Sequence, residues 1–577
     1  MCFPPLFPIF INVNPFVRKI AERVGREVGL PPEEVLPHVQ LPPNPDLGEY
    51  ALPCFPLAKA LGSQPHQLAS ELANRFRPDD EVLAAEAVGP YLNFRVDRIA
   101  LAGYILREVY EKGKGYGDSH EGRGETVVID FSSPNIAKPF GVHHLRTTVI
   151  GWSLYRLYGA LGYRTVGINH LGDWGTQFGK LIAAYVLWGD EEALDSDPIG
   201  HMLELYVKFH EEVEEKPELE EEAKAWFRRL EEGDEEARTL WGRFRELSLR
   251  EFKKVYDLMG VSFDYYWGES FYNGMIPEVV RRLKEMGLAE ESQGALVVDL
   301  SDYDMPPCLI LKSDETSLYA TRDIAAAIYR WGRFRFSKML YVVGADQQLH
   351  FRQVFKVLEL MGYGWADRCV HVPFGLMRFR DGKMSTRRGR IVLLEEVFGR
   401  AIELVKDIIR EKNPGLGNKE DVARKVGVGA VVFANLRGRR TKEAVFDWNE
   451  VLNFDGETGP YLQYTYARLC SILRKYGREP RADVEFGLLR EPEEWEVLRL
   501  LEGFPDALRS AAHQYEPGVL AGHMIDLAAA VNKFYNAHRV IGSDGELSDA
   551  RALLVHAART VLAKGLYLLG MEAPEEM

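Results

Sequence analysis

The stretch "ETVVIDFSSPNIAKPFGVHHLRTTVIG" (residues 125–151) decides the fold of the middle of the chain. Its apolar start, 125–133, predicts a buried strand, and a turn rich in Ser, Pro and Asn follows. Apolar residues then recur every three or four positions, which predicts a helix that ends at Gly162. The next segment, "RTVGINHLGDWGTQFG" (164–179), predicts a second strand and its loop. This strand–helix–strand order indicates a parallel, doubly wound α/β domain.

Two neighbouring histidines, His143 and His144, open the predicted helix. Free backbone N–H groups and the helix dipole favour an anion at a helix N-terminus. An imidazole can donate a hydrogen bond to a phosphate oxygen, and Lys138 in the same loop adds a positive charge. These residues indicate a phosphate site. The alternative is that the histidines only cap the helix or lie on the surface.

A second cluster of chemistry-bearing residues is the basic stretch "RFRDGKMSTRRGR" (378–390), which follows a predicted strand and contains two glycines. A mobile basic loop of this kind can clamp a polyphosphate as charge develops on it. A solvated basic loop, or a contact to a nucleic-acid backbone, is the alternative interpretation.

The bulk composition limits the class of protein. A length of 577 residues predicts about three to five domains, and the net charge of -15 argues against a surface wholly coated with nucleic acid, but not against a local basic channel. The five cysteines are scattered without a CxxC pair, which favours a reducing compartment and no structural zinc. We read the N-terminus as a cytosolic start, and no apolar stretch is long enough to span a membrane.

These patterns predict a multidomain α/β protein in three parts. Residues 1–115 form a small α+β domain, and residues 116–395 form a Rossmann-like domain with a doubly wound parallel sheet. The highly charged segment at about 190–260 is expected to be a solvated helical insertion in that domain. Residues 396–577 are expected to be all-helical.

Taken together with their flanks, these motifs identify a family. "HHLR" and "KMSTR" resemble the HIGH and KMSKS signatures of class I aminoacyl-tRNA synthetases. The resemblance to arginyl-tRNA synthetases is more specific and spans nearly the whole chain in the family's order. The segments that carry it are "GEYALPCFPLAK", "GPYLNF", "SSPNIAKPF", "GYRTVGINHLGDWGTQFGKL", "LYATRD", "DQQLHF", "KMSTRRG", "TGPYLQYTYAR", "DALR" (506–509) and the terminal "LGMEAPEEM".

The resemblance implies an activity and its partners. It implies ATP-dependent ligation of L-arginine to tRNA(Arg) through an arginyl-adenylate, with release of AMP and diphosphate. ATP is then a substrate, Mg²⁺ is expected with it, and bound tRNA is expected to be needed even for the first step. The N-terminal part would bind tRNA, and the helical C-terminal part would be a DALR-type anticodon-binding bundle. A cytoplasmic monomer that serves translation is the expected form.

Arginine requires planar acidic acceptors, because its guanidinium is a fork of five donors that keeps its charge. The resemblance implies that Glu269, Tyr319 and Asp323 hold the guanidinium, and that Asn135 and Gln347 hold the amino and carboxylate end, with Ser133 also binding arginine. Without the resemblance, Asp323 fits a helix N-terminal carboxylate equally well, and Glu269 fits a surface residue better.

The resemblance also implies residues for ATP and tRNA. The catalytic set is His143, His144, Lys138 and Lys383. The ATP-binding set is His144, Gly172, Asp173, Lys383, Met384 and Ser385. For tRNA, a basic cluster in "NLRGRRTK" and aromatic residues in the following helix suit phosphate contact and base stacking, although most of these aromatics also fit a helical core. The tRNA-binding set is Arg437, Arg439, Arg440, Tyr461 and Tyr466.

The chain departs from the family's pattern at two motifs. Gly141 replaces the first residue of the HIGH-type signature, and His143 replaces its glycine. That glycine allows adenine to approach the backbone closely, so the loop shifts, or His143 turns away, or adenosine binding is weaker. Thr386 replaces the second lysine of KMSKS, and Lys138 could supply that charge.

Three alternatives remain on sequence grounds. The first is a small nucleotidylyltransferase with a related turn, against which the length argues. The second is a tRNA-binding paralogue without activity, supported only by the altered glycine position. The third is a different amino-acid specificity, since acidic acceptors argue against apolar substrates but do not exclude lysine.

Overall fold

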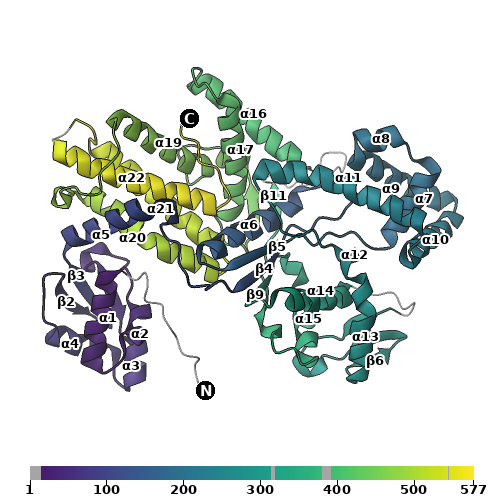
Figure 1. Cartoon of the computed structure of the whole chain (residues 1–577), viewed down its shortest axis with the longest axis horizontal. Helices are drawn as coiled ribbons and strands as arrows, with labels where there is room; N and C mark the ends of the chain where they lie inside the picture. Colours follow the sequence, from purple (N-terminus) through teal and green to yellow (C-terminus); the bar gives the residue numbers. More distant parts are fainter. Residues whose placement is uncertain (1–13, 313–318, 380–391, 543–544) are drawn as a thin grey trace. The chain divides into compact units, whose positions relative to one another are not determined.

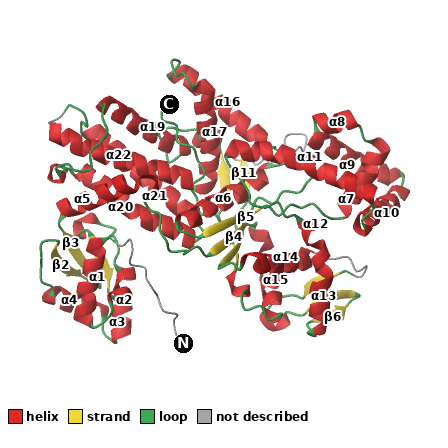
Figure 2. Ribbon diagram, in the orientation of Figure 1, coloured by secondary structure: helices red, strands yellow, loops and turns green. Residues whose placement is uncertain are grey.

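The computed structural model describes residues 14–312, 319–379, 392–542 and 545–577 (Figure 1). The chain divides into two compact units. The first comprises Met1–Glu121, Leu469–Asp506 and Asp526–Leu562, and the second comprises Gly122–Arg468, Ala507–Ile525 and Ala563–Met577. Figure 2 shows how few strands the chain has beside its helices.

A small α+β module begins the first unit. Its antiparallel sheet has the order β1-β3-β2, and Tyr50 of β1 lies opposite Phe94 of β3. Asn14 caps the first helix, since its side chain accepts a hydrogen bond from the backbone N–H of Phe16. The elements are α1 (Pro15–Val28), α2 (Pro32–Val35), β1 (Tyr50–Pro53), α3 (Phe55–Leu61), α4 (Pro65–Arg75), β2 (Val82–Val88), β3 (Tyr91–Val96) and α5 (Arg98–Lys112).

A four-stranded parallel sheet forms the centre of the second unit, with the order β10-β9-β4-β5. Ile129 of β4 lies between Gly167 of β5 and Leu340 of β9, so the strand order reverses beside β4. In open α/β sheets, ligands bind outside the carboxyl ends of the strands at such a point. The elements are β4 (Thr126–Asp130), α6 (Leu145–Ala160), β5 (Arg164–Ile168), β9 (Lys338–Tyr341) and β10 (Cys369–His371).

Helices cover the sheet and extend from it. A buried apolar core joins the strands to α14 (Tyr319–Phe334) and α15 (Gln348–Leu360), while α6 packs on β4 and β5 (Figure 1). Further elements of this region are α12 (Glu269–Tyr272), α13 (Ile276–Glu285), an antiparallel sheet of β6 (Ala289–Ser292), β7 (Ala295–Val298) and β8 (Cys308–Leu311), and a parallel pair of β11 (Met377–Phe379) and β12 (Ala444–Phe446).

The charged segment after β5 is helical. In α10 the buried residues are Leu219, Ala223, Trp226, Phe227 and Leu230, a helical spacing that places the acidic residues on the other side. The helices are α7 (Thr176–Trp188), α8 (Glu191–Ser196), α9 (Pro198–Glu215), α10 (Glu218–Glu232) and α11 (Glu235–Met259).

The chain from residue 392 onward is mostly helical. Its elements besides β12 are α16 (Leu394–Lys412), α17 (Lys419–Leu436), α18 (Trp448–Val451), α19 (Gly459–Tyr476), α20 (Pro492–His513), α21 (Pro517–Ala537) and α22 (Gly545–Leu568). The predicted fold class is confirmed: a parallel doubly wound sheet, a small α+β module before it and helices after it. In the part of the chain that the structure describes, no helix is long and apolar enough to cross a membrane.

Candidate active site

The loop between β4 and α6 is the centre of the candidate site, and its backbone is strained. Ser132, Ser133 and Ala137 all have positive φ angles, of 72°, 50° and 57°. Contacts from the rest of the unit hold this conformation. The backbone N–H of Ser132 donates to Thr147 Oγ1 at 3.0 Å, and that of Ala137 donates to Ser248 Oγ at 2.9 Å. Strain that the surroundings support in this way is typical of functional loops.

This loop pairs with the loop that follows β5. The Ile136 N–H donates to the Gly172 carbonyl at 3.2 Å, and the Gly172 N–H donates to the Pro134 carbonyl at 3.1 Å. A Cβ on Gly172 would collide with Asn135 Oδ1, so a larger residue there would displace the Asn135 side chain from its present position. The pairing holds Asn135, whose side chain is exposed, over the carboxyl ends of two neighbouring strands.

His143 and His144 lie in a single 3₁₀ turn, Val142–His144, directly before α6. Their ring centroids are 4.0 Å apart, and His143 is the more exposed of the two. Burial, with the neighbouring His143, lowers the pKa of His144 to about 3, and burial also lowers the pKa of His143. His144 is therefore neutral at physiological pH, so it can donate a hydrogen bond to a phosphate but cannot contribute a full charge.

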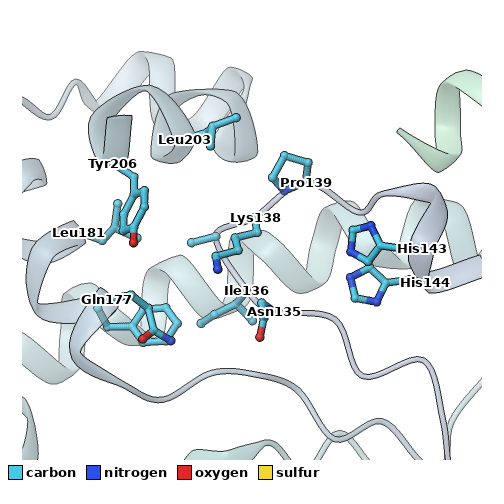
Figure 3. Close-up of a pocket in the computed structure, with 12 residues that line it drawn as sticks. Asn135, Ile136, Lys138, Pro139, His143, His144, Gln177, Leu181, Leu203 and Tyr206 are labelled. Atoms are coloured by element: carbon cyan, nitrogen blue, oxygen red, sulfur yellow. The ribbon is translucent and has the colours of Figure 1, made fainter. Parts of the chain in front are cut away.

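A pocket of about 380 Å³ opens beside the histidines (Figure 3). Lys138 and Asn135 line it from the loop after β4, and the exposed Lys138 side chain extends into it. The opposite wall comes from α7 and α9 and is mostly apolar: Gln177, Phe178, Leu181, Leu203 and Tyr206. The pocket thus combines a cationic, hydrogen-bonding side with an apolar side, the combination that a nucleotide needs.

Asp173 is fully buried, and its carboxylate is already engaged. It accepts hydrogen bonds from Ser270 N at 2.8 Å, Ser270 Oγ at 2.9 Å and Arg245 Nε at 3.0 Å. The Glu269 N–H donates to the Leu171 carbonyl at 3.0 Å. These contacts fix the segment that carries Glu269 against the loop after β5.

Glu269 is a buried carboxyl group, 8% exposed. Burial, against the opposing charge of Arg322 and together with the charges of Asp323 and Asp173, raises its pKa to about 8. The carboxyl group of Glu269 is thus mostly protonated at neutral pH in the absence of a ligand. A cation that entered beside it would favour its ionised form.

Asp323 lies on the first turns of α14, where its Oδ2 is 2.6 Å from Nε2 of His350. Burial opposes the ionisation of Asp323, but the hydrogen bond and charge of His350 lower its pKa below the usual range. Tyr319, which begins the same helix, is 62% exposed. Gln347 is also exposed, and its amide donates to Asp346 Oδ2 at 2.9 Å.

The structure brings forward charged residues that the sequence analysis did not single out. Arg330 is 1% exposed and binds Asp130 Oδ2 at 2.8 Å, while Ser133 Oγ donates to Asp130 Oδ1 at 3.0 Å. Arg330 also donates to the hydroxyl of Tyr272 at 3.1 Å. Asp130 could have been found from the sequence, because it is an acidic residue at the end of an apolar strand. Nothing in the sequence around His350, in "DQQLHF", pointed to its role.

The second signature, "KMSTR" (383–387), lies outside the described residues. Lys383, Met384 and Ser385 fall in the segment that the structure does not describe. The strand that leads into it, β11, is described, and Arg378 on it pairs with Glu443 at 2.8 Å.

The predicted tRNA-binding residues differ in exposure. Arg437 and Arg439 are exposed, and Arg437 pairs with Glu457 at 2.9 Å. Arg440 is half-buried, and both its backbone N–H and its guanidinium bind Glu516. Tyr461 is partly buried, and Tyr466 is 9% exposed. No group of three or more His, Cys, Asp or Glu side chains that could hold a metal ion occurs among the described residues.

Comparison with protein families places this site in a known class. The model of the arginyl tRNA synthetase N-terminal domain matches residues 16–96, that of the class I (R) tRNA synthetase catalytic domain matches residues 106–448, and that of the DALR anticodon-binding domain matches residues 462–577. The catalytic-domain match covers the candidate residues for arginine and ATP. The chain is a class I aminoacyl-tRNA synthetase in fold and family.

Individual relatives identify the family within this class. Proteins named arginine--tRNA ligase from Halothermothrix orenii and Clostridium perfringens are 48% and 50% identical to this chain, each over 97% of the chain and 100% of the relative. The solved arginyl-tRNA synthetase of Thermus thermophilus matches 97% of this chain and 100% of its own with a TM-score of 0.83 at 27% identity. That of Plasmodium falciparum, at 23% identity and a TM-score of 0.80, agrees in fold. The chain belongs to the arginyl-tRNA synthetase family.

Proposed function

We propose that the loop after β4 and the acidic side chains of α12 and α14 together form the active site of an arginine--tRNA ligase. As a member of its family, the chain ligates L-arginine to tRNA(Arg) with ATP. In the first step a carboxylate oxygen of arginine attacks the α-phosphate, diphosphate leaves, and arginyl-adenylate forms. In the second step a ribose hydroxyl of the tRNA's terminal adenosine attacks the activated carbonyl of arginyl-adenylate, and AMP leaves.

The carboxyl groups of Glu269 and Asp323 carry this proposal. They are close enough that the charge of Asp323 raises the pKa of Glu269. The Glu269 N–H binds the Leu171 carbonyl after β5, and Asp323 pairs with His350 after β9, so both contact the chain beyond the carboxyl ends of central strands. A guanidinium that binds both gains two charge-assisted pairs and relieves the cost of burying Glu269. Tyr319 would close this side of the arginine site. Ser133, Asn135 and Gln347 would hold the amino and carboxylate end.

The phosphates of ATP would lie against the turn that begins α6. His143 and His144 supply hydrogen-bond donors there, and Lys138 supplies a positive charge. Lys383, Met384 and Ser385 of the second signature would also bind ATP. The carboxylate of arginine is already a nucleophile, so positioning and charge stabilisation supply most of the catalysis and no strong base is required.

The loop after β5 would hold the adenosine side of ATP. Because Gly172 has no side chain, its loop passes close to Asn135. The backbone of this loop would then lie beside the nucleotide. Asp173 acts mainly by holding Ser270, and with it Glu269, in position. We also expect Mg²⁺ to enter with ATP, held mainly by the phosphates and by water.

The partners and outer parts of the chain complete the proposal. Residues 1–115 would contact the tRNA, residues 116–395 would carry the chemistry, and residues 396–577 would read the anticodon. Arg437, Arg439 and Arg440 would bind tRNA phosphates, and Tyr461 and Tyr466 would lie at the same interface. We further propose a monomer that works in the cytoplasm.

The decisive experiment is ATP–pyrophosphate exchange with the purified protein and each of the twenty amino acids, with and without tRNA. We expect exchange with arginine and with no other amino acid, and only when tRNA is present. Exchange with lysine of similar efficiency would refute the arginine site. Intact tRNA binding without exchange for any amino acid would favour the inactive paralogue, in which the "GVHH" turn has lost its ATP chemistry.

A further inference from the structure

Arg146 follows the histidine pair directly and has an unusual environment. It lies in the first turn of α6 and is 2% exposed. One of its terminal nitrogens, Nη1, donates to the carbonyl oxygens of Gly375 at 2.6 Å and of Lys442 at 2.7 Å. Among the described residues it makes no direct ion pair; two backbone carbonyl oxygens accept its hydrogen bonds, and the nearby charge of Glu516 also favours its ionised form.

The two carbonyls belong to segments 67 positions apart in the chain, and these segments meet at Arg146. Gly375 stands two residues before β11, which leads into the segment with Lys383. Lys442 stands two residues before β12, at the end of the basic cluster 437–442. The two strands pair in parallel, with Met377 opposite Ala444.

The junction is packed at backbone distance. The Gly375 N–H donates to the Arg440 carbonyl at 2.8 Å, and a Cβ on Gly375 would collide with the backbone of Thr441 and Lys442. The Ala444 N–H donates to the Leu376 carbonyl at 3.0 Å. Arg146 is therefore the side chain that joins this two-stranded junction to the helix that begins at the histidine pair.

We propose that Arg146 is a positioning residue for the ligation reaction, an inference that rests on the proposed function. The two signatures are far apart in the sequence, yet each must contact the same triphosphate. Arg146 is two residues from His144, and the carbonyl of Gly375 is eight residues from Lys383. By holding β11 against the start of α6, Arg146 positions the strand that leads into the second signature relative to the histidine pair, without touching the substrate. Displacement of a catalytic group by about 1 Å can cost about 10²-fold in rate.

The test compares Arg146→Gln and Arg146→Lys with a matched control, Arg156→Gln. Arg156 lies on the same helix and also donates to a backbone carbonyl, that of Tyr567 at 2.5 Å. ATP–pyrophosphate exchange with arginine and tRNA(Arg) gives kcat and both KM values, and thermal unfolding establishes the folded fraction of each variant. Hydrogen–deuterium exchange of the backbone over 375–379 and 442–446 reports the junction without any need for activity.

For Arg146→Gln we expect kcat to fall about 10²-fold while the KM for arginine stays within about threefold, since the acidic site does not contact Arg146. Arg146→Lys keeps the charge and one donating nitrogen, and kcat should be about tenfold higher than in Arg146→Gln. Amide exchange over β11 and β12 should accelerate at least about tenfold in Arg146→Gln and remain unchanged in Arg156→Gln.

Three results would overturn the proposal. The first is a kcat of Arg146→Gln within threefold of the wild-type value, and the second is an equal fall in kcat for Arg156→Gln. The third is wild-type amide exchange at the junction in Arg146→Gln. If the wild-type protein shows no ATP–pyrophosphate exchange with arginine, the proposed function is refuted instead. In that case the hydrogen–deuterium data would still decide whether Arg146 holds the junction.

Discussion

The pH dependence of arginine binding follows from the environment of Glu269. Its carboxyl group has a pKa of about 8 because it is buried and lies near Asp323 and Asp173, and Arg322 only partly offsets these effects. A guanidinium binds the ionised form, so binding must release a proton below pH 8. The affinity for arginine should therefore rise about tenfold from pH 6 to pH 7 and level off above pH 8. At pH 7 about 0.9 protons should be released for each arginine bound.

The other carboxylate of the proposed site should not contribute to this change. Asp323 has a lowered pKa, so it is already ionised across this range. Glu269→Gln removes the titrating group, and we expect the affinity of that variant at pH 8 to be at least about tenfold weaker, since a charge-assisted hydrogen bond is lost. Its affinity should also vary little between pH 6 and pH 8.

Isothermal titration calorimetry with arginine, repeated in buffers of different ionisation enthalpy, measures both the affinity and the number of protons released. Glu290→Gln, an exposed glutamate on β6, is the matched control and should behave as the unchanged protein. The reasoning fails if the affinity of the unchanged protein is flat between pH 6 and pH 7. It also fails if Glu269→Gln still releases about 0.9 protons at pH 7.

Three further predictions concern phosphate and tRNA. His143→Gly should lower ATP–pyrophosphate exchange about 10²-fold. Adding Gly141→His should restore most of this loss, because the extended backbone at Gly141 (φ -84°) does not require glycine; a double variant as slow as the single one would count against a shared phosphate role. Lys138→Ala should lower kcat about tenfold or more, whereas the exposed Lys284→Ala should not; equal losses would remove Lys138 from the phosphate site. Affinity for tRNA(Arg) should fall steeply from 50 to 300 mM salt, and Arg439→Gln should reduce the log–log slope by about 1; a flat response would contradict a phosphate-dominated interface.

The strand–loop–helix at 125–151 was predictable from the sequence because its signals are local. An apolar run followed by a 3–4 spacing is enough to specify β4 and α6, and the parallel sheet follows from their order. The family resemblance also rested on short segments that can be read one at a time. The same signals did not indicate where each candidate side chain would find its partners.

Asp173 and Asp323 show the limit of such reading. Asp173 appeared as a candidate ATP ligand, but its carboxylate binds Ser270, 97 positions later, and holds the Glu269 segment. Asp323 appeared as a ligand for the guanidinium, and the structure adds His350, 27 positions later, as the partner that keeps it ionised. Separations of this size leave no periodicity in a sequence.

The sequence by itself determined the order of secondary structure, the fold class and the residue types available for phosphate and guanidinium chemistry. Only the tertiary structure decided which of these groups are charged and what holds them. Glu269 has a raised pKa because folding removes it from water, and Arg146 reaches Gly375 across 229 positions because the sheet brings both to one junction. Burial and long-range contact are properties of the packed chain, since each depends on atoms that are remote in the sequence and near only in the fold.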